Sequence, residues 1–129
     1  MENTMFTYDS IYGQKERASK NGLIAILDRD IFCGLVDKHF RDKNGILHCA
    51  YSNLPISQDK LELEHIIPIS LGGGTVYFNC VPSLSEINGR NGKYNYYLFD
   101  WWEKSGYYSE ELLERLVNYL FEAYNVMIK

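Results

Sequence analysis

The middle of the chain contains a proline followed closely by three consecutive glycines, Pro68 and Gly72–Gly74. Proline lacks a backbone donor and glycine weakens helices and strands, so no regular element is expected to run through residues 68–74. The segment just before this break, from about Lys60 to Ile67, favours an extended strand. Helical patterns lie further away on both sides. The break therefore divides an extended centre from helical flanks.

The N-terminal flank has a helical pattern from about Gln14 to Arg41. Its apolar residues recur at spacings of three and four, which is typical of one face of a helix. That face contains Leu23, Ile24, Leu27, Ile31, Leu35 and Val36. Asn21-Gly22 interrupts the pattern, so the segment is either one long helix or two shorter ones. The first dozen residues are expected to be an irregular lead-in.

The extended centre predicts a β-hairpin. Asn44-Gly45 is a strong turn signal, and Ile46–Tyr51 after it has extended character. We expect this segment to pair with the strand at about Lys60–Ile67 around a polar turn at Ser52-Asn53.

The C-terminal flank favours helices. Residues 83–88 predict a short helix, and the aromatic segment 94–104 predicts another. Ser109 can cap a final helix from Glu110 to about Tyr124, because its hydroxyl can accept a bond from an early backbone N–H. The buried stripe of that helix is predicted to be Leu112, Leu113, Leu116, Leu120 and Phe121.

These elements predict an α+β fold in a single domain over residues 1–129. Its centre is a ββα unit at about residues 46–93, with helical flanks at 14–43 and 94–125. The apolar share of 46% can supply a core for one domain of this length, and the aromatic residues are expected to pack in it.

The charge balance argues against binding nucleic acid by general electrostatic attraction. The formal net charge is -4, whereas such binding usually needs a surplus of Lys and Arg. Residues 13–48 hold seven Lys or Arg against five Asp or Glu, and residues 49–129 hold six against ten. Any affinity for nucleic acid is therefore local, weak, or supplied partly by a partner.

The three cysteines, Cys33, Cys49 and Cys80, include no pair at CxxC spacing. This favours reduced thiols in a cytoplasmic protein over a disulfide framework. Residues 1–10 lack the basic start and apolar run of a signal peptide. The most apolar late stretch, Leu116–Ile128, is too short and too polar to span a membrane.

The residues that point to chemistry lie in the segment LEHIIPISLGGGTVYFNCVPSLSEINGRNGK, residues 63–93. It combines an adjacent carboxylate and imidazole, Glu64 and His65, with a glycine loop and later carboxamides. Adjacent residues in a strand point to opposite faces. One site can therefore use both only if the strand ends or bends there, which Pro68 favours.

This segment resembles the HNH, or ββα-metal, endonuclease family. The family signature has an Asn fourteen residues after its His and a His or Asn twenty-three after it, and Asn79 and Asn88 stand at these positions. Ser70 and Gly72-Gly73 also match. The Cys-Ala-Tyr-Ser run at 49–52 resembles the family's hairpin entrance. The resemblance covers roughly residues 47–93.

The resemblance implies a metal-dependent hydrolase of DNA phosphodiesters, for which RNA is an alternative substrate. It implies His65 as general base and Asn79 as the residue that braces the loop and helps to fix the His ring. It implies Glu64 and Asn88 as ligands of Mg²⁺ or Mn²⁺, with Arg90 and Lys93 holding a phosphate. One centre cuts one strand, so a nickase, a homodimer or a larger complex is expected.

Two departures from the family matter. Many members bind a structural zinc with two CxxC pairs, but Ser52 replaces the partner of Cys49, and Leu84 and Ile87 stand where a second pair would be. We therefore expect no structural zinc. The acidic balance also favours an alternative: an inactive module on the same scaffold that binds nucleic acid or protein, as part of a larger phage or bacterial defence assembly.

Other polar and aromatic residues have simpler interpretations. The aromatic run at 94–102 could stack on bases, but packing against the ββα unit is favoured. Lys15, Arg17 and Lys20 could contact a DNA backbone, but a solvated helix face is favoured. His39 and His48 are expected to be ordinary surface or turn residues.

Overall fold

The computed structural model describes residues 4–87 and 98–129. Its helices and strands are α1 (Tyr8–Lys20), α2 (Arg29–Phe40), β1 (Leu61–His65), β2 (Cys80–Leu84), α4 (Leu98–Ser105) and α5 (Glu110–Met127). Three short 3₁₀ turns span Gln58–Lys60, Ile69–Leu71 and Tyr77–Asn79. This is the α+β fold class that the sequence predicts.

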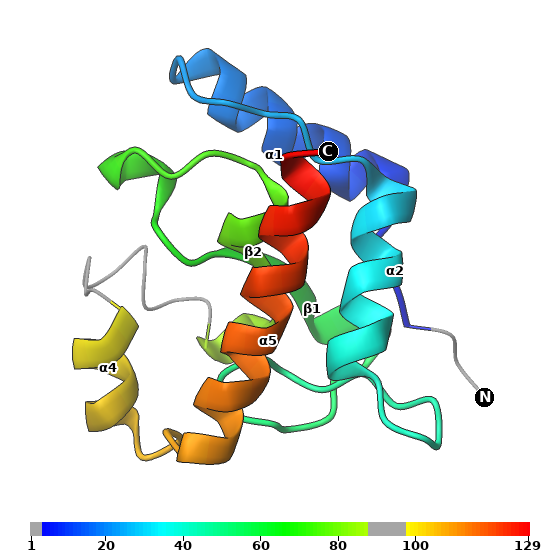
Figure 1. Ribbon diagram of the computed structural model, residues 1–129, viewed down its shortest axis with the longest axis vertical. Coiled ribbons are helices and arrows are strands. Elements are labelled where there is room, and N and C mark those ends of the chain that lie inside the picture. The colour runs from blue at the N-terminus through cyan, green and yellow to red at the C-terminus, as the bar shows by residue number, and fades with distance from the viewer. Residues whose placement is uncertain (1–3, 88–97) are drawn as a thin grey trace.

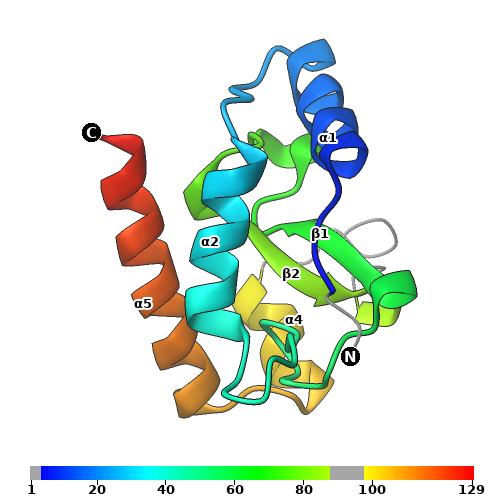
Figure 2. The ribbon, with the colours of Figure 1, turned by 90° about the vertical axis from the view of Figure 1, so that its right-hand side faces the viewer.

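Two helices cover one side of the two-stranded sheet. α2 packs against both α5 and β2, and Figure 2 shows α5 and α2 side by side next to the strands. α1 crosses one end of the molecule and α4 lies at the other end (Figure 1). None of the described helices is long and apolar enough to cross a membrane.

The N-terminal flank forms two shorter helices, one of the two alternatives left open by the sequence. The irregular lead-in was wrong, because α1 begins at Tyr8, where Thr7 caps it by accepting a bond from the N–H of Ser10 at 3.1 Å. Gly22, with a φ of 73°, lies just beyond its end. Asp28 caps α2 in the same way, at 3.0 Å from the N–H of Ile31.

The predicted apolar stripes are correct only in part. In the N-terminal flank Leu27, Leu35 and Val36 are buried, but Ile24 and Ile31 are exposed. The link between α1 and α2 is not helical, so the helical spacing does not hold across it. α5 begins at Glu110 after the Ser109 cap, as expected.

Within α5, the face toward the core is turned from the predicted one. Leu112 and Leu116 are buried, but Phe121 is 71% exposed. Tyr119 and Ala123 are fully buried in its place, because α5 packs on both α2 and the 3₁₀ turn Tyr77–Asn79.

The predicted hairpin was wrong. β1 pairs antiparallel with β2, from Leu61 opposite Leu84 to His65 opposite Cys80. Residues 46–51 form only isolated bridges, Arg41 with Leu47 and His48 with Pro55. A tight turn closes the chain there, since the N–H of Cys49 bonds to the carbonyl of Leu54 at 2.9 Å.

β2 was not predicted as a strand because it carries no alternating pattern. All five of its residues are buried, so neither face alternates between core and solvent, and Pro82 and Ser83 interrupt the apolar run that would mark a buried strand. Ser83 and Leu84, expected in a short helix, belong to this strand, and residues 85–87 are helical.

Aromatic side chains form much of the core, as expected. Trp102 is fully buried, and its indole N–H donates to the main-chain oxygen of Tyr51 at 2.8 Å. The ring of Tyr51 packs edge-on against Trp101 and Trp102. The hydroxyl of Tyr119 donates to the main-chain oxygen of Cys80 at 2.7 Å. Trp102 therefore supports the packing interpretation of the C-terminal aromatic run.

Candidate active site

His65 occupies the end of strand β1, beside the glycine loop. It is the last residue of the strand, its backbone pairs with Cys80, and its side chain is 6% exposed. Nε2 of the imidazole lies 2.9 Å from the hydroxyl of Thr75, which follows the three glycines. β1 ends at His65. This is the strand end that the sequence requires if Glu64 and His65 are to serve one site.

Asn79 holds the loop that leaves His65. Its Oδ1 accepts a bond from the N–H of Ile67 at 2.8 Å, and its Nδ2 donates to the carbonyls of Ile67 and Gly74 at 3.0 Å each. Its own carbonyl accepts from the N–H of Ile66 at 2.9 Å. The main chains of Ile66 and Ile67, which follow His65, are therefore both hydrogen-bonded to Asn79.

The glycine loop closes against these groups because it has no side chains. A Cβ on Gly73 would lie 1.7 Å from the carbonyl oxygen of Ile67 and 2.7 Å from Nδ2 of Asn79. Gly72 has a φ of 95°, a left-handed conformation that glycine adopts without strain. Gly73 is therefore required because the backbone of Ile67 lies so close, and Gly72 because of its left-handed backbone conformation.

The surroundings of His65 keep its imidazole neutral. Burial, and to a lesser degree the positive charge of Arg17 on α1, lower the pKa of His65 from 6.5 to about 4. At neutral pH the ring is therefore unprotonated and has a nitrogen that can accept a proton.

Glu64 precedes His65 and is fully buried, with its backbone opposite Val81. Its charge adds to burial in raising the pKa of the Cys80 thiol. The described residues contain no group of three or more His, Cys, Asp or Glu side chains that could hold a metal ion. A metal centre here would need carboxylate and amide oxygens, which suit Mg²⁺ and Mn²⁺, from Glu64 and residues beyond that set.

Comparison with known proteins adds a second line of support. Residues 49–97 match a family model described as HNH endonuclease. This segment belongs to the HNH endonuclease family. The match includes Glu64, His65 and Asn79 and agrees with the range predicted from the signature spacing. No curated protein matches the chain.

The structure does not describe every predicted site residue of the HNH segment. It brings His65 and Asn79 together through the loop and sets Glu64 next to His65 in β1. Asn88, Arg90 and Lys93 lie outside the described residues, so their roles stay predictions.

The positions of the family's zinc ligands do not suit a metal here. Leu84 and Ile87 are buried in the hydrophobic core, at 6% and 7% exposure. The thiol of Cys49 is free and lies 3.9 Å from the hydroxyl of Ser83. Apolar packing therefore occupies the place that a second Cys pair would take.

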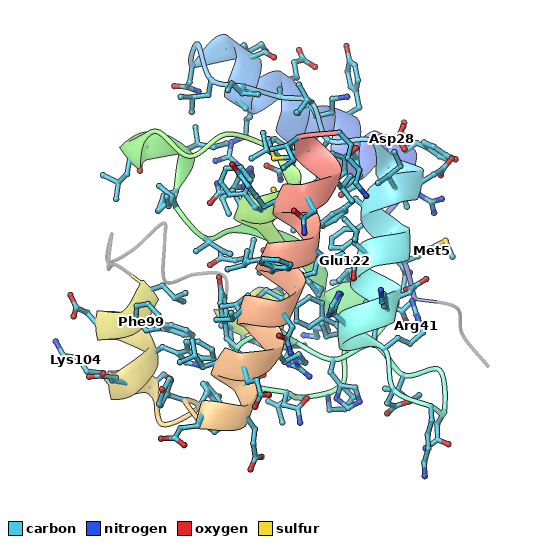
Figure 3. All side chains as sticks on the ribbon, in the orientation of Figure 1. Met5, Asp28, Arg41, Phe99, Lys104 and Glu122 are labelled. Carbon is cyan, nitrogen blue, oxygen red and sulfur yellow. The ribbon has the colours of Figure 1, made fainter. Side chains whose placement is uncertain are left out.

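The other two histidines lie away from His65. Nε2 of His39, on α2, is 3.4 Å from Glu122, which lies on α5 where it faces α2 (Figure 3). The ring of His48 lies between the carboxylate of Asp42 and the main-chain oxygen of Asn53, 2.8 Å from each. His48 lies in a turn, as predicted. The side chain of His39 is mostly buried instead, at 13% exposure, because its ring packs edge-on against Tyr119.

Two residues near His65 were not assigned to the site from the sequence. Thr75 had no motif spacing to mark it, although a hydroxyl directly after a glycine loop was a usable signal. Arg17 was interpreted as part of a solvated face; it is exposed, yet its charge acts on His65. The contact between α1 and the loop, which brings Arg17 near, depends on tertiary structure alone.

Proposed function

We propose that the protein is a metal-dependent endonuclease that hydrolyses DNA phosphodiester bonds, one strand at each centre. The observation that carries this proposal is the buried, neutral imidazole of His65 at the end of β1 within the HNH segment. A general base must be unprotonated at working pH and held in a fixed orientation, and the burial of His65 and its contact with Thr75 supply these two conditions. The lowered pKa of about 4 also makes this imidazole a weaker base than a free histidine.

In this mechanism His65 accepts a proton from a water molecule as that water attacks the phosphorus. The bond from phosphorus to the 3′ oxygen breaks, which leaves a 5′ phosphate and a 3′ hydroxyl after the departing oxygen takes a proton. Asn79 fixes the loop that follows His65 and so helps to hold the ring toward the attacking water.

Charge on the phosphate must be offset during this step. Glu64 and Asn88 would hold Mg²⁺ or Mn²⁺, which when bound neutralises charge on the phosphate and the departing oxygen. Arg90 and Lys93 would hold a phosphate of the DNA backbone. A double-strand break needs two centres, so we propose nicking by the monomer or double-strand cleavage by a homodimer or larger complex.

The test is incubation of the purified protein with supercoiled plasmid and Mg²⁺ or Mn²⁺. We expect open-circle product from the wild type and a loss of about 10²-fold or more in His65→Ala. His39→Ala is the matched control and is expected to nick at the wild-type rate. Nicking that persists unchanged in His65→Ala would refute the assignment of the base.

The net charge of -4 favours a second candidate, an inactive binding module on the HNH scaffold. That module binds no catalytic metal, so titration calorimetry with Mn²⁺ separates the two. Heat released by the wild type and lost in Glu64→Ala and Asn88→Ala excludes the inactive module. Absence of heat and of nicking in the wild type would instead favour it.

A further inference from the structure

A chain of hydrogen bonds connects His65 to the N-terminal helix. Nε2 of His65 lies 2.9 Å from Oγ1 of Thr75, which in turn lies 3.0 Å from the main-chain oxygen of Gln14 in α1. A carbonyl can only accept, and a hydroxyl has one hydrogen to donate. Thr75 therefore donates to Gln14 and accepts from His65.

This direction of bonding selects one tautomer of the imidazole. Nε2 must carry the hydrogen that it donates to Thr75, so in the neutral ring Nδ1 carries the lone pair. Nδ1 is then the nitrogen that accepts a proton. A ring in the other tautomer would present a hydrogen at Nδ1 and could not act as a base there.

The main chain of Thr75 is held on both sides, and its side chain is buried. The residue is fully buried, its N–H donates to the carbonyl of Ile24 at 2.9 Å, and its carbonyl accepts from the N–H of Leu27 at 3.3 Å. A Cβ on Gly74 would lie 2.5 Å from the oxygen of Ile24, so glycine lets the loop approach this segment. Figures 1 and 2 show the loop lying beneath α1 and the link that follows it.

α1 lies outside the segment that matches the HNH family, residues 49–97. We propose that Thr75 is a positioning residue for hydrolysis by His65, and that α1, through the carbonyl of Gln14, is part of the active site. The proposal rests on the proposed function. It assigns a role to an N-terminal helix that the family signature does not contain.

The first test reads the tautomer directly and needs no nuclease activity. Nitrogen-15 chemical shifts of the imidazole of His65 are measured at pH 7 in the full-length, metal-free protein. We expect a protonated Nε2 and an unprotonated Nδ1 in the wild type and in Thr75→Ser, which keeps the hydroxyl. In Thr75→Val, which has a similar shape without a hydroxyl, we expect a mixture of both tautomers.

The signals of His39 and His48 serve as internal controls and are expected to be unchanged. A wild-type spectrum with the hydrogen on Nδ1 would overturn the proposal, even if Thr75→Val does not fold. A Thr75→Val spectrum identical to the wild type would also overturn it. Lack of nicking by the wild type is a separate result, because it refutes the proposed function while the tautomer measurement still stands.

The second test separates positioning from general structural support. We expect Thr75→Val to lower kcat for plasmid nicking about tenfold to hundredfold with little change in KM, and Thr75→Ser to stay within about threefold of the wild type. In a His65→Ala background, Thr75→Val should cause no further loss of activity. An equal loss in both backgrounds would mean that Thr75 does not act through His65.

Discussion

At the residue scale, the carboxamide of Asn79 is matched to its three partners. Its oxygen faces one N–H and its nitrogen faces two carbonyls, all within the loop that follows His65. Only an amide supplies an acceptor and two donors in this arrangement. The side chain is therefore specified by the backbone around it as well as by any role in catalysis.

We predict that Asn79→Asp is more destabilising than its close similarity in shape suggests. A carboxylate would turn an acceptor toward the carbonyls of Ile67 and Gly74, so two donors are lost and a buried charge is left facing oxygens. We expect a loss of about 3 kcal/mol in the free energy of unfolding at pH 7, measured by urea denaturation followed by Trp fluorescence.

The pH dependence of the same variant provides its check. Burial beside carbonyls raises the pKa of an introduced carboxyl in the folded state, so its protonated form is favoured there. Stability relative to the wild type should therefore recover as the pH falls and decline as the pH rises. A difference that is constant from pH 4 to pH 8 would contradict this account of the site.

The residues of the site were predictable to different degrees. His65 and Asn79 follow from fixed spacing, because the length of the loop between them is set by backbone contacts that the chain makes locally. Thr75 was not predictable in its role, since the acceptor of its hydrogen bond is a main-chain carbonyl of Gln14, sixty-one residues away. Every residue has a main-chain carbonyl, so the amino-acid sequence does not indicate which carbonyl accepts this hydrogen bond.

At the scale of elements, the glycine loop is fitted closely between β1 and the 3₁₀ turn Tyr77–Asn79. We predict that Gly73→Ala destabilises the protein by about 3 kcal/mol, because its Cβ would overlap the backbone of Ile67, which cannot move without breaking the bonds to Asn79. The same variant should lower nicking activity, since the loop carries Thr75 and follows His65.

Gly13→Ala is the matched control for this change. Gly13 lies within α1, and a Cβ there would meet nothing within 4 Å. Alanine is the better helix former, so we expect a gain of about 0.5–1 kcal/mol. Thermal unfolding of the two variants tests the prediction. Equal effects would show that the close approach at Gly73 is relieved by a small shift of the loop.

Elements with local signals were predicted well, and the sheet was not. Ser109 and the acidic residues after it mark the start of α5, because capping depends on neighbours in the sequence. The pairing of β1 with β2 depends on which buried segment lies opposite, and no local signal marked Cys80–Leu84 as the partner of Leu61–His65. The turn signal at Ser52-Asn53 instead belongs to a tight closed turn, where Asn53 has a φ of 62°.

At the scale of the whole molecule, α5 holds the turn at residues 49–53 from the far end of the chain. Arg115 donates to the carbonyls of Cys49 and Ala50, at 2.9 and 3.4 Å, and to the side chain of Asn53 at 2.8 Å. Its guanidinium also lies over the ring of Phe40, 5.0 Å from the centroid. These contacts join the C-terminal helix to the start of the HNH segment.

We predict that Arg115→Met lowers the free energy of unfolding by about 2–3 kcal/mol, because the turn loses the guanidinium bonds to the carbonyls of Cys49 and Ala50 and to the side chain of Asn53. Arg115→Lys should lie in between, since one ammonium cannot reach all three oxygens at once. Lys38→Met is the control: its ion pair with Glu122 is exposed, and its loss should cost less than about 1 kcal/mol.

Removal of metal ions tests whether the turn at residues 49–53 is stabilised by protein contacts or by a bound metal. If Arg115 and Trp102 hold the turn, a zinc-selective chelator should leave the thermal unfolding midpoint of the wild type unchanged, whereas EDTA should abolish nicking without unfolding the protein. The midpoint is measured by circular dichroism with and without each chelator. A midpoint lowered by the zinc chelator would mean that a metal, rather than α5, stabilises this end of the HNH segment.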